Sequence, residues 1–389
     1  MLDDLLPRPC LTAEEKQLLD SVRTLARERI EPRAAGHDET AGFPWDNIAD
    51  INALGLNRMF IPAEFGGYPL SYTAYLASLA AISGACASTG LIWATNFHAV
   101  APIVTFGDDL QKARWLPVIA AGGLAALAIT EPAGGSDATS MTTRFVPQDD
   151  TITISGGKAF ITSGDVADIC LVFGKWSEIG AGRAAISAVV VEKGSPGFDV
   201  LRRENKMGHR ASSTVALRFD DCRVPRSNLL GRPGEGLQIL LATLNKSRPS
   251  IAVHALAIAR AALGDAVAYT NQRQVRGKRI IEHQGNKFLV ADLATELVLC
   301  ETLLWTLAAQ VDAGATDIGI HAAMLKLRSA DLAMRITTEA TQLCGGYGYC
   351  RDLRLERLMR DAKLLQIGEG SAQTLREVIG RRFVARPLP

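Results

Sequence analysis

Thr151-Ile152-Thr153-Ile154-Ser155-Gly156-Gly157 marks the point at which this chain changes its structural period. Thr and Ile alternate as in a half-buried strand, and the Ser-Gly-Gly that follows predicts a turn. Further β-rich runs, bounded by Gly, Pro or Asp, cover 168–173, 184–192 and 214–219. None of the gaps has room for a crossover helix, so the sequence predicts a small antiparallel β domain rather than a βαβ nucleotide fold.

Helical signals lie on both sides of this region. Before it, Thr12-x-x-Glu15 is a capping box, and apolar residues recur at helical spacing up to Pro32. More N-terminal helices are expected over 45–54, within 65–107 and over 111–121. After it, four helices are expected over 237–273, 286–313, 318–343 and 372–383, with the wide apolar faces of a four-helix bundle.

The sequence therefore predicts an α+β multidomain protein. We expect an N-terminal α-helical domain over 1–123, a middle β domain over 124–233 and a C-terminal α-helical bundle over 234–389.

Composition excludes several classes of function. The chain has 389 residues, and 42 Lys and Arg against 41 Asp and Glu leave a net charge of +1, so nothing indicates a nucleic-acid surface. The seven cysteines are scattered without a C-x-x-C pair, which argues against a disulfide framework or a metal site and favours a reducing compartment. The first residues lack the basic and apolar regions of a signal peptide, so we expect a cytoplasmic protein.

The segment 65–107 contains no Asp, Glu, Lys or Arg, which is also a property of membrane spans. It is rich in Ser, Thr, Gly and Ala, and it includes Asn96, His98 and Pro102. A bilayer span is more uniformly apolar. We therefore expect helices buried inside a large soluble protein, with no membrane insertion.

The stretch Thr130-Glu131-Pro132-Ala133-Gly134-Gly135-Ser136-Asp137 predicts a shaped loop. Pro fixes one dihedral angle, and the glycines allow the backbone to approach a ligand closely. Free N–H groups in such a loop suit an anionic, oxygen-rich ligand. Gly-Gly-Ser-Asp is also an ordinary surface turn, so the loop by itself leaves both interpretations open.

Several separated motifs agree in order and spacing with one known family. They cover 127–137, 157–162, 207–212, 269–284, 342–346, 359–363 and 366–371. On these residues the chain resembles the acyl-CoA dehydrogenase family over nearly its whole length. The resemblance implies FAD held between the β domain and the bundle, usually in a homotetramer that is a dimer of dimers.

Glu369, between Gly368 and Gly370, is the candidate catalytic base. A flavin dehydrogenase of thioesters removes the α-hydrogen as a proton and passes the β-hydrogen as hydride to flavin N5, so it needs a positioned base. A carboxylate with apolar neighbours is a better base. Local sequence alone favours a surface Glu beside helix-capping glycines, but family members commonly carry the base here. Others carry it at the position of Ser247, which cannot serve.

The resemblance also implies the residues that contact FAD. Around the flavin these are Leu127, Ile129, Thr130, Ser136, Phe160, Thr162, Ser371 and Gln373. Expected to reach the adenosine and pyrophosphate from a neighbouring subunit are Arg273, Gln284, Gln342, Gly345 and Gly346. Structural alternatives stay open for four of these elements: Phe160 as a core-facing strand residue, Thr162 as a β-former, Arg273 as a solvated helix end, and 344–349 as a helix stop.

For the substrate, the resemblance implies that the thioester and its pantetheine or phosphate arm are held by Ser136, Asn245, Arg248 and Gly370. Three positions depart from the family pattern. Asn245 replaces the usual Asp, which removes a charge, and Arg276-Gly277 replaces Phe-Gly. Gly368 replaces an aromatic residue, which predicts a branched, cyclic or otherwise non-standard acyl group.

The partners implied are an acyl-CoA or acyl-carrier-protein thioester and an electron-transfer flavoprotein that reoxidises the flavin. The motif residues do not separate the two carriers, because both present pantetheine. A non-enzymatic flavoprotein that binds nucleic acid is one alternative, but it requires a basic surplus that is missing here. A flavin oxidase or desulfinase-type variant is another, and such relatives often lack the glutamate.

Overall fold

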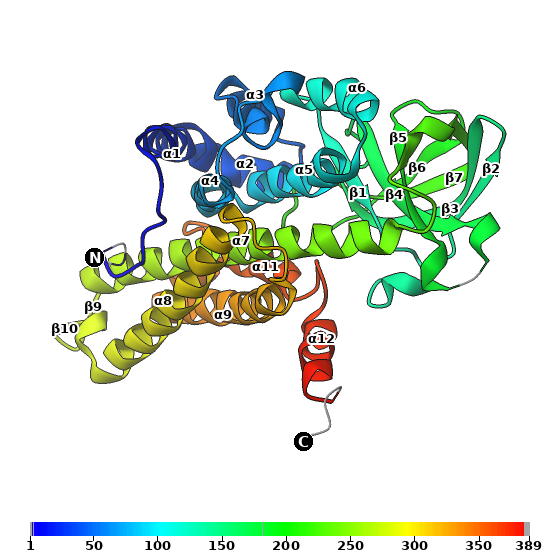
Figure 1. Cartoon of the computed structure of the whole chain (residues 1–389). Helices are drawn as coiled ribbons and strands as arrows, with labels where there is room; N and C mark the ends of the chain where they lie inside the picture. Colours follow the sequence, from blue (N-terminus) through cyan, green and yellow to red (C-terminus); the bar gives the residue numbers. More distant parts are fainter. Residues whose placement is uncertain (1, 3, 181, 385–389) are drawn as a thin grey trace.

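The computed structural model describes residues 2, 4–180 and 182–384, and it contains helices, then a sheet, then helices again, as predicted (Figure 1). The outermost residues of the predicted terminal domains (1, 3 and 385–389) lie outside the described residues. The N-terminal helices are α1 (Ala13–Leu25), α2 (Glu31–Thr40), α3 (Trp45–Ala53), α4 (Tyr72–Ala85), α5 (Ala87–Phe106) and α6 (Asp109–Ala120). The capping box of Thr12 and Glu15 at the start of α1 is confirmed.

Pro32 does not end the first helical region, in contrast to the prediction. A π-helical segment, Ala26–Ile30, follows α1, and Pro32 then occupies the first turn of α2. Proline removes one hydrogen bond of the helical ladder and its ring needs space, and the wider π-helical turn just before it, in which Glu31 N–H donates to Ala26 O, provides that space.

The charge-free segment 65–107 forms α4 and α5, and most of their side chains are buried. Among the described helices, α7 (Gly236–Gln272) alone has the length and hydropathy of a membrane span, but 67% of its most apolar window is buried inside the protein. It is therefore a core helix. Pro249 lies inside it, and the Tyr72 hydroxyl donates to the carbonyl of Lys246, close to where proline disrupts the helical ladder.

The middle domain is a mainly antiparallel sheet. Its strands are β1 (Ala125–Ala128), β2 (Arg144–Gln148), β3 (Thr151–Thr162), β4 (Ile169–Trp176), β5 (Ile186–Glu192), β6 (Phe198–Arg203), β7 (Thr214–Pro225) and β8 (Leu229–Leu230). They are ordered β6-β7-β3-β2-β4-β5-β8. Two pairings are parallel, since β1 and β2 both lie along β4. The alternation in the sequence predicts strands but carries no information on the direction of their partners.

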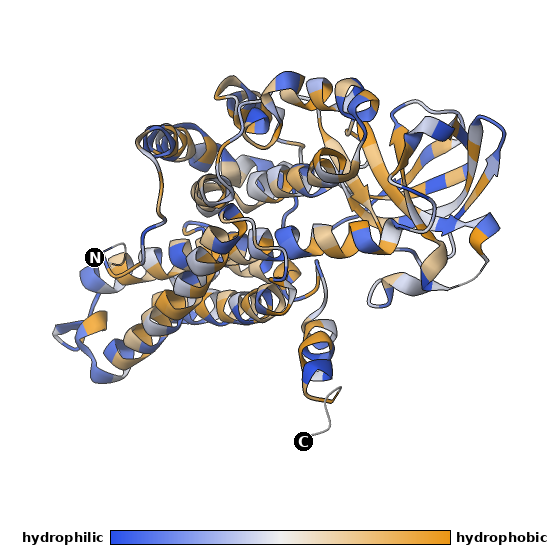
Figure 2. Cartoon of the chain, viewed as in Figure 1, coloured by the Kyte–Doolittle hydropathy of each residue, from blue (hydrophilic) through white to orange (hydrophobic). Residues whose placement is uncertain are grey.

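Strands β4 and β5 are buried on both faces, and they separate two apolar cores. On β4, Cys170 and Val172 face one core, while Ile169, Leu171 and Phe173 face the other. This alternation is the two-residue period of a strand. Figure 2 shows these strands as largely hydrophobic ribbons beside the N-terminal helices. The second core includes Trp115 and Leu116 of α6, so the sheet and the N-terminal helices fold against each other.

The C-terminal region contains α7, α8 (Gln284–Asp312), α9 (Gly319–Cys344), α10 (Gly346–Tyr349), α11 (Leu355–Leu365) and α12 (Ala372–Val384). The long helices α7, α8 and α9 and the shorter α11 share one apolar core. A small hairpin, β9 (Gln274–Val275) and β10 (Lys278–Arg279), joins α7 to α8. In Figure 1 it lies at the opposite end of the molecule from the sheet, and α12 projects from the body.

Candidate active site

Glu369 lies in the loop that joins α11 to α12, and the loop is held closely. Gly368 N–H donates to Leu364 O at 2.9 Å, and Ala372 N–H donates to Gln366 O at 3.0 Å. Glu369 has φ +55°, a left-handed conformation that is uncommon for a residue with a side chain. Such backbone conformations persist only where the surroundings impose them, and they concentrate at functional sites.

The Glu369 carboxylate is partly buried, with 18% of its side chain exposed. Ser247 of α7 donates its hydroxyl proton to Oε2 at 2.7 Å. His98 of α5 places Nδ1 3.7 Å from Oε1. The two carboxylate oxygens therefore face different helices, which are far apart in the sequence.

Two cations lie near this carboxylate. Burial lowers the pKa of Arg248, and the negative charge of Glu369 opposes that shift. Burial also lowers the pKa of Lys326, to about 8, and Glu369 again acts in the opposite direction. Lys326 of α9 donates to the carbonyl of Gly370 at 2.6 Å, so it also anchors the loop.

Neither His98 nor Lys326 is predicted from the sequence as a site residue. His98 is notable there only as a polar residue in a charge-free segment, and no motif includes Lys326. A signal for both exists in their burial, because a buried His or Lys needs a partner. Burial is not visible in a single sequence.

The predicted loop Thr130–Asp137 is organised around Glu131. Its carboxylate accepts hydrogen bonds from the N–H and hydroxyl of both Thr142 and Thr143, and from Lys158 at 2.8 Å. Burial alone would raise the pKa of Glu131, but the hydrogen bonds from Lys158, Thr142 and Thr143 outweigh it and lower the pKa to about 2. Glu131 and Gly134 also exchange two backbone hydrogen bonds. This loop is shaped by a buried ion pair that the loop's Gly and Pro content did not predict.

Phe160 lies on β3 in a bulge between Lys158 and Ile161. Its φ is +58°, and 64% of the residue is exposed. The alternative that Phe160 faces the core is therefore wrong. Thr162, at the end of β3, is half-buried. The start of β1 is joined to α5, because Ala125 N–H donates to the side-chain oxygen of Asn96 at 2.8 Å, two residues before His98.

The structure brings only some of the predicted site residues to Glu369. Arg248 and Gly370 lie beside it, together with Ser247, which was not predicted as a site residue. Arg273 and Gln284 flank the β9–β10 hairpin, away from the sheet (Figure 1). Gln342 lies 16 residues after Lys326 on α9, which is about 24 Å along the helix. Within one chain, these residues are therefore not assembled with Glu369.

The other predicted residues are distributed as follows. Ser136 and Gln373 are exposed, and the Ser371 hydroxyl accepts from Thr374 N–H in the first turn of α12. Asn245 donates to the carbonyl of Thr316, which precedes α9. Leu127, Ile129 and Thr130 are half-buried at the end of β1, and Gly345 and Gly346 are exposed after α9.

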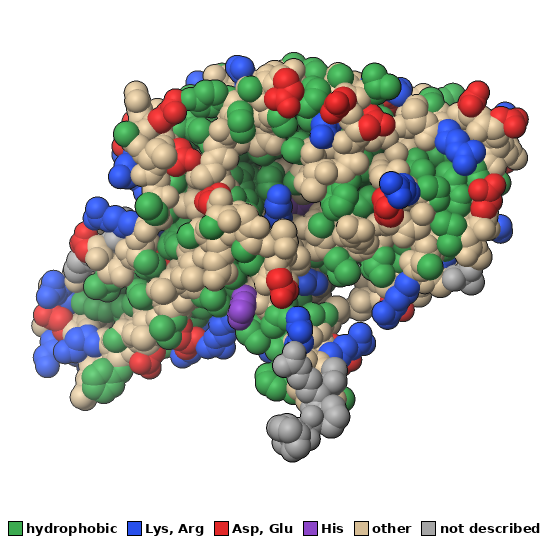
Figure 3. All heavy atoms as spheres, viewed as in Figure 1, with side chains coloured by type: hydrophobic (Ala, Val, Ile, Leu, Met, Phe, Trp, Pro, Cys, Tyr) green, Lys and Arg blue, Asp and Glu red, His purple; other side chains and the backbone are tan. Residues whose placement is uncertain are grey.

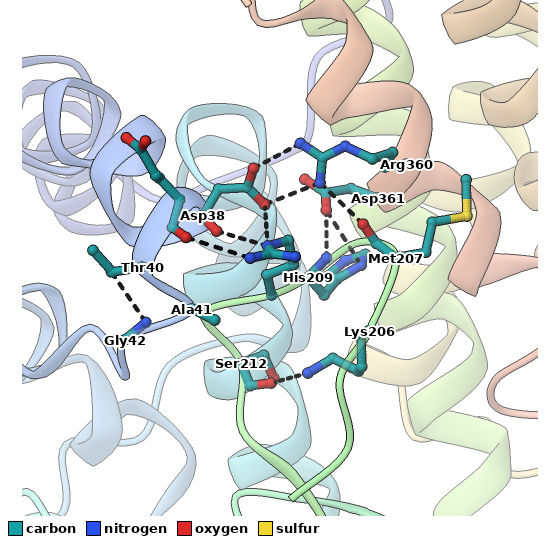
Figure 4. A network of polar contacts seen from close by, with 12 residues as sticks. Asp38, Thr40, Ala41, Gly42, Lys206, Met207, His209, Ser212, Arg360 and Asp361 are labelled. Atoms are coloured by element: carbon teal, nitrogen blue, oxygen red, sulfur yellow. Dashed lines mark hydrogen bonds and ion pairs between the residues drawn. The ribbon is translucent and has the colours of Figure 1, made fainter.

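Two of the recognised motifs meet at a domain junction rather than at Glu369 (Figure 4). Arg360 of α11 binds Asp38 of α2 through both carboxylate oxygens, at 3.1 and 2.6 Å, and it donates to Met207 O at 3.0 Å. His209 N–H donates to the buried Asp361. Burial raises the pKa of Asp361 to about 7. All three regions of the chain are joined at this network.

Within the described residues, no group of three His, Cys, Asp or Glu side chains is placed to hold a metal ion. The seven cysteines, all within the described ranges, are free. On the face in Figure 3, acidic and basic side chains are interspersed over most of the surface.

Comparison with known proteins gives one consistent family. The N-terminal, middle and C-terminal domain profiles of acyl-CoA dehydrogenases match residues 12–123, 126–222 and 234–384. The cyclohex-1-ene-1-carbonyl-CoA dehydrogenase of Geobacter metallireducens is 40% identical over 377 residues, which cover 96% of this chain and 99% of that protein.

Two solved structures are similar over almost the full length. The butyryl-CoA dehydrogenase of Megasphaera elsdenii has a TM-score of 0.93 and 32% identity, covering 97% of this chain and 100% of the other. A chain from the structure of the electron transferring flavoprotein of Acidaminococcus fermentans has a TM-score of 0.93 and 35% identity, covering 97% of this chain and 99% of the other.

Proposed function

The chain belongs to the acyl-CoA dehydrogenase family of FAD-dependent oxidoreductases, and from that premise we propose that Glu369 is the base that removes the α-proton of its acyl-CoA substrate. The observation that carries this proposal is the partly buried carboxylate held by Ser247 on a strained loop. Positioning of this kind is what general-base catalysis requires, and it typically contributes about 10²–10⁴ in rate. Ser247 is a donor to the base and not a base itself.

The thioester oxygen needs hydrogen-bond donors while the α-proton leaves. We propose the Glu369 N–H as one of them. In the part of the chain that the structure describes, this N–H donates to no protein acceptor, and Gly370 beside it keeps the loop free of a side chain. Lys326, through the Gly370 carbonyl, holds that backbone in place.

FAD, when bound, supplies the acceptor for the β-hydrogen as hydride. The residues at the end of β1 and on β3 suit a flavin ring: Phe160 offers an exposed aromatic face from a strained bulge, and Thr130 and Thr162 are half-buried hydroxyl groups. Leu127, Ile129, Ser136, Ser371 and Gln373 complete the proposed contacts.

We assign Arg273, Gln284, Gln342, Gly345 and Gly346 to the adenosine and pyrophosphate of FAD in a neighbouring subunit. The position of Arg273 and Gln284 supports this assignment. They flank the β9–β10 hairpin, at the opposite end of the molecule from the sheet, and so lie away from a flavin bound next to Glu369 of the same chain. The proposal therefore includes a homo-oligomer, with a dimer of dimers as the form expected. It also includes a cytoplasmic location.

The acyl group is proposed to be bulky, and a cyclic one fits best. A Cβ on Gly368 would meet nothing closer than Leu364 O at 3.8 Å, and the residue is not left-handed. Glycine is therefore not required by the backbone, and its missing side chain leaves space next to the base. A relative named for a cyclohexene thioester is among the most similar proteins. Asn245 and Arg248 are proposed to hold the pantetheine arm, and CoA is the carrier that the family favours.

An electron-transfer flavoprotein is the proposed acceptor for the electrons. The similarity to a chain in such a flavoprotein's structure supports this choice. A direct test is reduction of purified electron-transfer flavoprotein by the enzyme and its substrate without oxygen. Rapid oxygen consumption in place of that reduction would identify an oxidase instead.

The central experiment mixes FAD-loaded enzyme anaerobically with a panel of acyl-CoA thioesters and follows loss of the yellow colour. We expect cyclic and branched thioesters to bleach the enzyme faster than straight-chain ones. The acyl-group proposal is wrong if every straight-chain thioester outperforms the bulky ones. The Glu369→Gln variant should stay yellow with every thioester of the panel. The control is Glu377→Gln, at an exposed position on α12, which should behave as wild type.

A further inference from the structure

His98 is a buried side chain with an unusual environment. The ring is fully buried in α5, and Nε2 lies 3.0 Å from the hydroxyl of Ser250. Nδ1 makes no hydrogen bond within the described residues, yet it faces Glu369 Oε1 at 3.7 Å. A buried polar atom without a partner is unfavourable, and it requires an explanation such as strain, a bound water or a role in catalysis.

The neighbouring groups favour one direction for the protons. The Tyr75 hydroxyl lies 2.9 Å from Ser250 Oγ, and Ser250 Oγ lies 3.0 Å from His98 Nε2. If Tyr75 donates to Ser250 and Ser250 donates to Nε2, the ring proton is on Nδ1 and points at the carboxylate. The opposite tautomer would place a nitrogen lone pair against the oxygen of an anion.

Burial favours the neutral form of the His98 imidazole. Burial lowers the pKa of His98, and the Glu369 carboxylate only partly opposes that effect. The groups that face this pair from other helices are Arg248 and His254 of α7 and Lys326 of α9. Burial and His98 also lower the pKa of His254, to about 3, so it adds no charge.

We propose that His98 is a positioning residue for the catalytic base, holding Glu369 Oε1 through an Nδ1–H proton that Ser250 and Tyr75 keep in place. This inference rests on the proposed function of Glu369. The separation of 3.7 Å is about half an ångström longer than a hydrogen bond, and catalytic contacts of this kind often shorten in the substrate complex.

The two carboxylate oxygens then have different tasks. His98 Nδ1–H can only donate, so Oε1 remains an acceptor throughout. The Ser247 hydroxyl can donate before proton transfer and accept afterwards, because a hydroxyl carries both a proton and lone pairs. Oε2 is therefore the oxygen that receives the α-proton.

Two nearly isosteric variants separate the two ring nitrogens. The amide nitrogen of Asn lies near the position of Nδ1, and that of Gln lies near Nε2. His98→Asn therefore keeps a donor to Glu369 and loses Ser250. His98→Gln loses the donor to Glu369 and keeps a contact with Ser250, in which the amide donates and the Ser250 hydroxyl accepts. In FAD-loaded enzyme we expect His98→Gln to bleach about ten-fold more slowly, and His98→Asn to stay within about three-fold of wild type.

The pH dependence of bleaching distinguishes positioning from a structural role. A lost donor makes the ionised carboxylate, which is the active form of a base, less stable. The acidic limb of the rate profile should move up by about one pH unit in His98→Gln and little in His98→Asn. Equal losses in both variants, or an unmoved limb in His98→Gln, would overturn the proposal.

A spectroscopic measurement reads the proton directly. The enzyme has six histidines, so the ring-nitrogen shifts of ¹⁵N-histidine-labelled protein are resolvable, and the signal lost in His98→Gln belongs to His98. We expect the Nδ1–H tautomer, and an Nε2–H tautomer would refute the assignment.

If neither His98 variant retains FAD, the Ser250→Ala variant is used in their place. The acidic limb of its rate profile must then move to higher pH, by less than is expected for His98→Gln. Loss of bleaching in Glu369→Gln with unaffected His98 variants would retain the proposed function and reject this inference alone.

Discussion

Glu131 and Glu369 both lie in glycine-containing loops, yet their surroundings differ in kind. Glu131 is buried, receives five hydrogen bonds and has a pKa lowered to about 2. Glu369 receives one close hydrogen bond, from Ser247, and faces His98 at a longer distance. A carboxylate whose lone pairs all accept hydrogen bonds has no place for another proton. A carboxylate such as Glu131 is therefore suited to a structural role. A sparsely bonded carboxylate keeps lone pairs free to accept a proton.

The largest expected effect comes from Glu369→Gln. The amide has the same shape and cannot accept the α-proton, so bleaching by substrate should slow by about 10²–10⁴-fold. The thermal midpoint should change little, because Ser247 can still donate to the amide oxygen. Stopped-flow absorbance gives the rate and calorimetry the midpoint. Bleaching of Glu369→Gln at a near-normal rate would mean that Glu369, like Glu131, has no catalytic role.

Glu131→Gln should have the reverse pattern. It leaves the Lys158 ammonium, which is fully buried, without a charged partner, and we expect a loss of about 3–5 kcal/mol in the free energy of unfolding. Chemical denaturation followed by circular dichroism measures the loss. The double variant Glu131→Gln/Lys158→Met removes both charges and should recover most of it. A single variant as stable as wild type would contradict the structural role.

The contribution of Glu131 should also depend on pH. Its pKa falls from an ordinary 4.5 to about 2 in the folded protein, so the ionised form stabilises folding above pH 4.5. As the pH falls from 4.5 towards 2, the unfolded chain takes up the proton first, and about 3 kcal/mol is lost. The stability gap between wild type and Glu131→Gln should narrow over that range. A constant gap would contradict the ion-pair explanation.

The smallest effect is expected from Gly368→Phe, beside Glu369. It fills the space next to the base without backbone strain, so bleaching by cyclic thioesters should fall about ten-fold while short straight-chain thioesters are spared. Gly368→Ala is the matched control, and its preference should stay close to wild type. A uniform loss for all substrates would indicate damage to the loop rather than a change in specificity.

Much of the fold was readable because its signals are local. The capping box at Thr12, the alternation in β3 and the wide faces of α7 to α9 each depend on neighbours within a few residues. The parallel pairing of β1 and β2 with β4 was not readable, because the period of a strand says nothing about its partner.

The site was only partly predictable for a similar reason. Glu369 and Arg248 came from motifs, but His98 lies 271 residues before Glu369 and carries no pattern around it. Ser247 was considered only as a base, and its role as a donor becomes visible with the 2.7 Å contact. Contacts between distant side chains depend on packing, which a single sequence does not encode locally.

The contact between Gly208 and Arg360 limits how this protein can be recombined with its relatives. A Cβ at Gly208 would meet the Arg360 carbonyl oxygen at 2.3 Å, and the side chain of Arg360 reaches Asp38 in the first helical region. The first part of this contact involves only backbone at position 360, so it requires Gly at position 208 whatever the parent of the last region. Exchanges are therefore expected to give folded hybrids when position 208 stays Gly and the Asp38–Arg360 pair is kept whole.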